Sequence, residues 1–234
     1  MSLTSTARKR VYLRYPMMAE RPHVENLRDD AVVIGIDVGS VARGCHAVAL
    51  KGTRYLKKLN TSDTRVLAEW CKDSGAIAIG IDAPCHWSST GRARLAESEL
   101  MRKKIWCFST PSIDSAQNHP KNHFGWMRCG ALLYEHLFSA GYSLYCGNHP
   151  TNQPVCFETF PHAIACALRG EIVSAKRKRQ VRPALLRENA IEIEALTNID
   201  WIDAGLCALV AHRLLSDSVK TYGDVQEGFI VVPR

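Results

Sequence analysis

Acidic residues follow hydrophobic runs at several points of the chain, and these acids are its clearest candidates for chemistry. The tripeptide Gly-Ile-Asp ends two apolar runs, at Asp37 and Asp82, and Glu158 follows a third run, Val-Cys-Phe. An acid directly after a buried strand loses hydration unless it is hydrogen bonded, paired with a cation or bound to a metal. The carboxyl ends of strands are also where sites form in α/β sheets. We therefore expect Asp37, Asp82 and Glu158 to share one site.

A further acidic pair, Asp200 and Asp203, lies three residues apart at the start of a predicted helix, so both carboxylates fall on one helix face. Converging carboxylates suit a hard divalent cation such as Mg²⁺ or Mn²⁺, and a pair of such ions promotes phosphodiester cleavage. Plainer interpretations remain: Asp37 and Asp82 could form turns, Asp200 could cap the helix, and Asp203 could complement the helix dipole. The predicted ligands are Asp37, Asp82, Glu158 and Asp203, with Asp200 as a neighbour that shares the ion or caps.

The pattern of hydrophobic residues predicts the elements that would position these acids. Apolar β-branched runs indicate buried strands, alternating runs around Lys51-Gly52 indicate a hairpin, and helical spacing ahead of glycine indicates helices. The predicted strands cover residues 31–37, 43–50, 52–59, 76–82, 142–146, 155–160 and 228–233. The predicted helices cover residues 62–75, 92–104, 123–141, 161–170, 183–197 and 200–218, with a basic connector over 174–182. Strands that alternate with helices in this way indicate a mixed α/β sheet.

Length and composition fit one domain over residues 31–234, preceded by a basic arm over residues 1–30. The chain has 234 residues, of which 46% are hydrophobic and 23% charged, which is enough apolar material for a sizeable core. It contains no apolar run of about eighteen residues, and its first residues lack the apolar stretch of a secretory signal. We therefore predict a soluble, cytoplasmic protein without a membrane partner. The nine cysteines include no C-x-x-C pair, so we expect reduced and mostly buried thiols.

The charge balance favours a polyanionic partner. The formal net charge is +7 and the isoelectric point is near 9.0, values that suit a protein binding nucleic acid. The expected contacts to the nucleic-acid backbone are Arg92 and the consecutive residues Lys176, Arg177, Lys178 and Arg179. A short basic run is also typical of a solvated loop, and that interpretation stays open.

Aromatic residues are frequent between the second and third acids, in the part of the chain where substrate choice would be expected. They are Trp87, Trp106, Phe108, Phe124 and Trp126. Such rings could stack on nucleic-acid bases, but packing in the core is the expected role for most of them.

Five motifs, in this order, resemble a known family: GIDVGS, GIDAPCHWS, CFETFPHA, DWIDAGLCALVAHRL and GFIVVP. They are similar to the marks of domain-of-unknown-function family 429, a set of predicted nucleases with an RNase H-like fold, and the resemblance covers residues 31–233. It implies a mixed five-stranded sheet flanked by helices, similar to RuvC-type resolvases. The acids that it implies lie on the first and fourth strands, on or after the fifth strand and on the last helix. They match Asp37, Asp82, Glu158 and Asp203.

The expected function is therefore that of a nuclease dependent on Mg²⁺ or Mn²⁺ that acts on DNA or RNA. A non-catalytic module of the same fold that binds nucleic acid or protein is the main alternative. The loop GIDVGS also looks like the first phosphate-binding turn of actin-like and sugar-kinase ATPases. Those proteins duplicate the fold, whereas this chain has one copy and no convincing second glycine-rich loop, which disfavours ATP binding.

Overall fold

A single mixed sheet organises the computed structural model, which describes residues 30–40, 42–148 and 153–234. The strands are β1 (Val32–Val38), β2 (Cys45–Lys51), β3 (Arg54–Thr61), β4 (Ala78–Asp82), β5 (Ser143–Leu144), β6 (Val155–Glu158), β7 (Val219–Asp224) and β8 (Gly228–Pro233). Their order is β3-β2-β1-β4-β6-β8-β7, with β5 also beside β6. β1, β4, β6 and β8 run parallel, whereas β2, β3 and β7 are antiparallel to their neighbours. The carboxyl ends of β1, β4 and β6 therefore lie at one edge.

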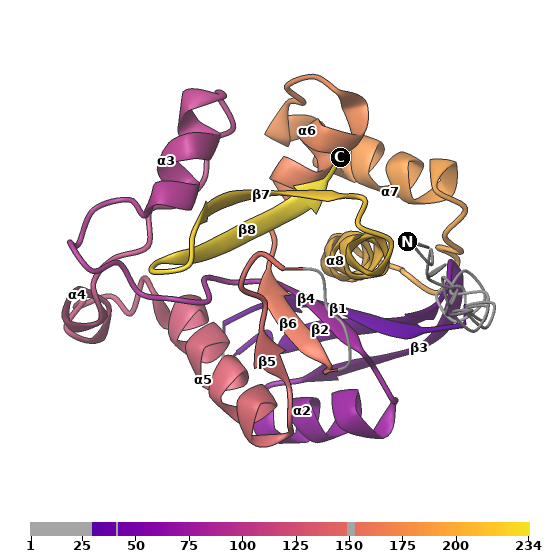
Figure 1. The fold of residues 1–234 in the computed structure, drawn as a ribbon, viewed down its shortest axis with the longest axis horizontal. Coiled ribbons are helices and arrows are strands. Elements are labelled where there is room, and N and C mark those ends of the chain that lie inside the picture. The colour runs from indigo at the N-terminus through magenta and orange to yellow at the C-terminus, as the bar shows by residue number, and fades with distance from the viewer. Residues whose placement is uncertain (1–29, 41, 149–152) are drawn as a thin grey trace, which may run out of the picture.

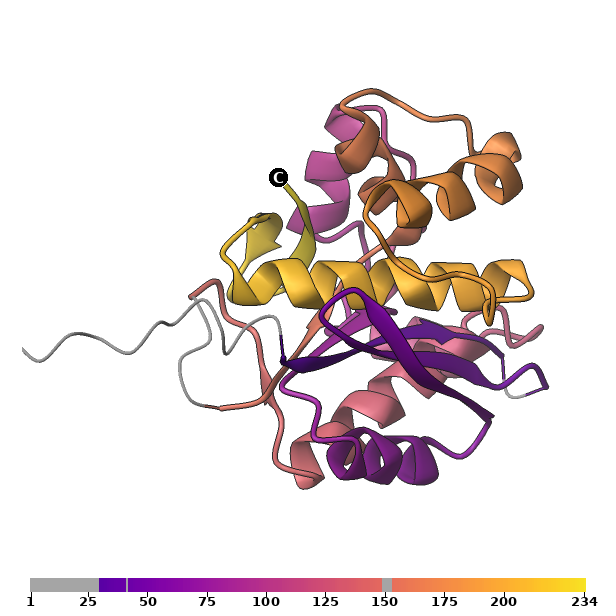
Figure 2. The ribbon, with the colours of Figure 1, turned by 90° about the vertical axis from the view of Figure 1, so that its right-hand side faces the viewer.

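Helices cover both faces of this sheet. They are α2 (Thr64–Asp73), α3 (Leu95–Arg102), α4 (Ile113–Gln117), α5 (Gly125–Ser139), α6 (Pro161–Arg169), α7 (Lys178–Glu188) and α8 (Ile199–Leu215), with a 3₁₀ turn at Ala175–Arg177. α2 and α5 cover one face and α8 crosses the other, while α6 and α7 lie beyond α8 (Figures 1 and 2). None of the helices in the described part of the chain combines the length and apolar character needed to cross a bilayer.

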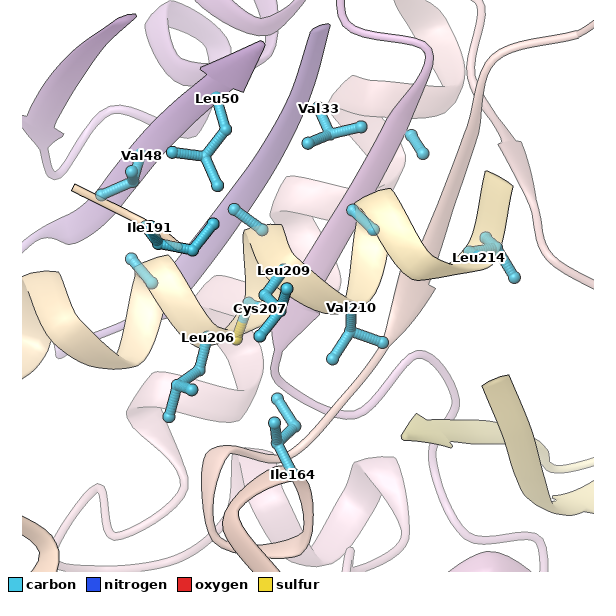
Figure 3. Close-up of a cluster of buried hydrophobic side chains, with 14 of the residues drawn as sticks. Val33, Val48, Leu50, Ile164, Ile191, Leu206, Cys207, Leu209, Val210 and Leu214 are labelled. Atoms are coloured by element: carbon cyan, nitrogen blue, oxygen red, sulfur yellow. The ribbon is translucent and has the colours of Figure 1, made fainter. Parts of the chain in front are cut away.

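The central helix α8 is apolar nearly all round because it is covered on both sides. Val33, Val48 and Leu50 of the sheet lie on one side of it, and Ile164 of α6 lies on the other (Figure 3). All four side chains are fully buried in the same hydrophobic cluster. A helix between two layers loses the polar face of a surface helix, which explains the continuous apolar sequence of α8.

Two glycines let α8 lie directly on the strands that carry the predicted acids. Gly35 of β1 and Gly80 of β4 are neighbours in register. A Cβ atom on Gly35 would lie 2.0 Å from the carbonyl oxygen of Ala204, and one on Gly80 would lie 2.5 Å from that of Cys207. Both distances are far inside van der Waals contact, so only glycine permits this approach. The repeated Gly-Ile-Asp motif thus joins a docking position for the helix to an acid two residues later.

The mixed α/β architecture is confirmed, but the sheet has eight strands in the described residues rather than the five that the resemblance implies. The hairpin β7-β8 extends the sheet beyond β6, and the two-residue strand β5 adds to it. β7 was absent from the predicted elements because it is an edge strand in which only Val219 and Tyr222 are buried. Such a strand lacks the regular alternation that indicates a half-buried strand.

The predicted helix over 183–197 was misplaced. The structure has α7 at Lys178–Glu188, so it begins inside the predicted basic connector and contains Pro183. It ends where Ala190 takes a positive φ of 58°, which stops a helix. The arm over residues 1–30 lies, apart from Asp30, outside the described residues. All nine cysteines are free thiols, and five of them are buried.

Candidate metal centre

The strand register brings Asp37 and Asp82 together. They occupy facing positions near the carboxyl ends of the parallel strands β1 and β4. The start of α8 adds Asp200 in its first turn and Asp203 one turn later. Asn198, rather than Asp200, caps this helix, because its side-chain oxygen accepts from the backbone N–H of Trp201 at 2.9 Å. Asp200 is therefore not needed as a cap.

These four aspartates line one cavity of about 490 Å³, which we call the acidic cavity. Its wall also includes cationic, imidazole and aromatic side chains. Its complete lining is Asp37, Val38, Gly39, Ser40, Arg43, Gly44, His46, Asp82, Trp126, Phe160, Lys178, Arg182, Asp200 and Asp203. Four of the five predicted acids thus meet in one place, from three separate segments of the chain.

Three of these carboxyl groups, those of Asp37, Asp82 and Asp203, resist ionisation in this arrangement. Burial, followed by repulsion from Asp203 and Asp200, raises the pKa of Asp37 from its ordinary value of 3.8 to about 7. Burial and the neighbouring Asp37 raise the pKa of Asp82 well above its ordinary value. Burial also raises the pKa of Asp203, although Arg182 opposes this shift. A bound cation would relieve both causes, because it neutralises the repulsion and compensates lost hydration.

Arg182 of α7 already supplies one positive charge to this cavity. Its Nη1 donates to Oδ2 of Asp203 at 2.5 Å, and both side chains are buried. The second oxygen of Asp203, Oδ1, is buried and has no hydrogen-bond partner among the described residues. A buried carboxylate oxygen without a donor is costly, which makes this atom a natural position for a further cation.

His46 is a site residue that the sequence patterns do not indicate. It lies on β2 directly opposite Asp37 in the antiparallel register. Ligand atoms of Asp37, His46 and Asp200 lie within 4.8 Å of one another. Burial, ahead of the charge of Lys58, lowers the pKa of His46, which favours the neutral form that binds metals. Only the register of the hairpin identifies this residue, because nothing in its sequence neighbourhood points to a site.

Glu158 is the one predicted ligand that does not line the acidic cavity. Its two oxygens accept from Nη2 and Nη1 of the buried Arg94 at 2.6 and 2.9 Å, and Oε2 also accepts from the backbone N–H of Cys85 at 2.9 Å. Arg94 also bonds Glu97. Protein donors already satisfy this carboxylate, so we remove Glu158 from the expected ligands and assign it to the ion pair that ties α3 to β6.

The residues predicted to contact the backbone of a nucleic acid also divide into those that line a cavity and those that do not. Lys178 lines the acidic cavity, and Arg179 lines an adjoining cavity of about 800 Å³. Lys176 and Arg177 are exposed in the preceding 3₁₀ turn. Arg92 is exposed but lines neither cavity. Two further cations that the sequence patterns do not indicate are Arg182, which lines the acidic cavity, and Arg43, which lines both cavities.

Comparison with known proteins gives a family but no individual relative. Residues 35–227 match a family described as "Protein of unknown function (DUF429)". No curated protein and no solved structure matches the chain. The matched segment includes all four aspartates of the acidic cavity as well as His46.

Proposed function

We propose that this chain, which belongs to the family DUF429, is a divalent-metal-dependent nuclease. Its proposed reaction is hydrolysis of phosphodiester bonds of DNA or RNA. The proposal includes an RNase H-like fold. The path β3-β2-β1-β4-β6 supports that fold, because it is a five-stranded mixed core to which β5 and the β7-β8 hairpin are added. The acids also lie on the first and fourth strands and on the last helix, where the resemblance implies them.

The observation that carries the proposal is the convergence of four aspartates in one cavity with raised pKa values for Asp37, Asp82 and Asp203. The donor set fits Mg²⁺ or Mn²⁺, since it consists of carboxylate oxygens with the imidazole of His46, a ligand that Mn²⁺ accepts more readily. The unpartnered Oδ1 of Asp203 supports the same fit. A bound ion would lower the pKa of a water molecule and stabilise the leaving oxygen.

The residues of the chain have separate roles in this proposal. Asp37 and Asp82 hold the ion from the strand ends, and Asp200 and Asp203 hold it from α8. Lys178 and Arg182 line the same cavity and can bond a phosphate oxygen of the substrate. Arg182 would then exchange part of its contact with Asp203 for the substrate.

Replacement of Asp37 by Asn tests the proposal directly. We expect Asp37→Asn to reduce Mn²⁺-dependent cleavage of a panel of DNA and RNA substrates by roughly a hundredfold or more. Calorimetric titration with Mn²⁺ should show weaker binding to the same variant. Asp73→Asn, an exposed aspartate at the end of α2, is the matched control and should behave as the wild type. Cleavage at the wild-type rate by Asp37→Asn would exclude the proposed centre.

A non-catalytic protein that binds nucleic acid is the second candidate. The observation that favours it is the existing pair between Arg182 and Asp203, which already neutralises one carboxylate. Such a protein should retard nucleic acid on a gel without a metal and without cleavage. Thermal stabilisation by MgATP would instead favour the ATP-binding alternative.

A further inference from the structure

Two exposed aromatic rings lie on the segment that follows α3. Trp106 and Phe108 are 71% and 64% exposed, although rings of this size normally contribute to the core. Together with Trp126 they are defined here as the aromatic platform. We propose that this platform stacks on unpaired bases, so that the substrate is single-stranded nucleic acid; this inference rests on the proposed function and specifies its substrate class.

Phe108 and Trp126 connect the platform to the acidic cavity. The rings of Phe108 and Trp126 meet edge to face, with centroids 6.2 Å apart. Both residues line a hollow of about 50 Å³ to which Asp82 also contributes. Trp126 and Phe160 line the acidic cavity as well. A nucleic-acid strand bound at the carboxylates would therefore lie next to aromatic rings. These rings extend from the acidic cavity to the exposed ring of Phe108.

Exposed cations lie close to the aromatic rings along the chain. Lys103 and Lys104 are exposed, and only the buried Ile105 separates them from Trp106. Lys178 and Arg182 lie at the acidic cavity. Basic side chains interleaved with aromatic rings are typical of sites that hold a single strand, in which phosphates contact the cations and bases stack on the rings.

Base stacking on the platform would discriminate single-stranded from double-stranded nucleic acid. In a duplex each base is already stacked on its neighbours, so an exposed ring gains little unless a base is turned out. An unpaired base offers its free face to Phe108 or Trp106. The exposed Lys103 and Lys104, close to Trp106 along the chain, complement a polyanion, which favours nucleic acid over an apolar protein partner.

The test compares three labelled probes by fluorescence anisotropy in EDTA, so that binding is measured without cleavage. The probes are an oligothymidylate of about twelve nucleotides, an abasic strand of the same length, and the blunt duplex formed with oligoadenylate. We expect the wild type to bind the thymidylate strand more tightly than the abasic strand. Phe108→Ala and Trp106→Ala should each weaken binding of thymidylate about fivefold or more, and leave binding of the abasic strand unchanged.

Two further variants serve as controls. Phe108→Tyr keeps an aromatic ring and should retain the affinity of the wild type. Phe138→Ala removes a 43% exposed ring on α5 that lines neither cavity, and it should have no effect. Equal affinity of the wild type for the thymidylate and abasic strands would overturn the inference. Unchanged thymidylate binding by both platform variants would do the same.

Cleavage in Mn²⁺, measured separately on the single strand and the duplex, distinguishes this inference from the proposed function. Cleavage of duplex alone would leave the nuclease assignment in place and overturn the platform. Platform-dependent binding of single strands without any cleavage would support the platform and contradict the nuclease assignment.

Discussion

Asp37 and Asp82 face each other across neighbouring strands, and the charge of Asp37 raises the pKa of Asp82. Burial is the larger cause of the raised pKa in both, and the charge of the neighbouring aspartates adds to it. A bound cation would offset this cost. On the proposed function, the same two residues therefore affect both the stability of the metal-free protein and the affinity for metal.

This cost should depend on pH. The pKa of Asp37 is 3.8 ordinarily and about 7 in the fold, so the folded state binds the proton more tightly than the unfolded chain. Between these two values, the contribution of Asp37 to the free energy of unfolding falls as pH rises, and its full cost is present above about 7. The variant Asp37→Asn has no ionisable group at this position, so it does not lose stability in this way as pH rises.

We expect metal-free Asp37→Asn to gain stability over the wild type by on the order of 3 kcal/mol between about pH 4.5 and pH 8, or roughly 6–12 °C in Tm. Thermal unfolding of both proteins in EDTA checks this. A difference in Tm that stays constant across this range would show that Asp37 ionises normally. Mn²⁺ added to the wild type should remove most of the pH dependence.

The buried Arg94 leads to a separate prediction about stability. Its side chain is fully buried and bonds both Glu158 and Glu97. Arg94→Gln should lower the free energy of unfolding by roughly 3–5 kcal/mol, because it leaves buried carboxylates without their cation. Urea unfolding measures the loss. Arg92→Gln, an exposed arginine two residues earlier, is the control and should change stability little.

The double variant Arg94→Gln with Glu158→Gln tests the assignment of Glu158. It should recover part of the lost stability, because the second change removes one of the uncompensated charges. If Glu158→Gln alone abolished Mn²⁺ binding at unchanged stability, Glu158 would return to the set of metal ligands.

At the scale of elements, the position of α8 decides whether a site exists. Asp200 and Asp203 reach the strand acids only because α8 lies against Gly35 and Gly80 without intervening side chains. The two glycines and the two aspartates occupy matching places in β1 and β4. Small changes in the contact between helix and strands should therefore affect the acidic cavity directly.

Gly35→Ala should destabilise the protein by about 3 kcal/mol or more, since the new Cβ would meet backbone atoms of α8 at 2.0 and 2.1 Å. Chemical unfolding measures this change. Gly205→Ala is the control on α8 itself, where a Cβ would meet only the ends of Leu196 and Leu186 at 3.0 and 3.1 Å. It should change stability by about 1 kcal/mol or less, because those ends can move. Equal effects of the two substitutions would contradict the proposed role of Gly35.

Sequence patterns predict those parts of the fold that depend on local periodicity. The apolar runs before Asp37 and Asp82 are strands, and the segment around Asp200 and Asp203 is a helix, so these four acids were found. β7 was missed because an edge strand has little hydrophobic pattern. Sequence patterns do not indicate His46, because its role depends on the strand register that places it opposite Asp37, nine residues away. They do not indicate Arg94 either, because its partner Glu158 lies 64 residues away along the chain.

At the scale of the whole molecule, cations of the described residues lie both beside the acidic cavity and away from it. Lys178 and Arg179 begin α7 at the two adjoining cavities, on the α8 side of the sheet. Lys72 lies on α2, on the opposite face (Figure 1). We therefore expect Lys178 and Arg179, but not Lys72, to neutralise phosphates and so release counterions from a bound nucleic acid.

The combined variant Lys178→Ala with Arg179→Ala should make the dependence of log K on log salt concentration shallower by roughly one for each removed charge. Anisotropy titrations at several salt concentrations measure this slope. Lys72→Ala should leave the slope unchanged. A slope that is insensitive to the double variant would place the nucleic acid elsewhere on the surface.

The order in which the acids occur along the chain has a consequence during biosynthesis. Asp37 and Asp82 leave the ribosome early, whereas Asp200 and Asp203 belong to α8, the last helix of the described chain. At ordinary elongation rates this delay is on the order of ten seconds or more. The proposed metal centre can therefore assemble only after α8 has left the ribosome, well after the two strand acids have emerged.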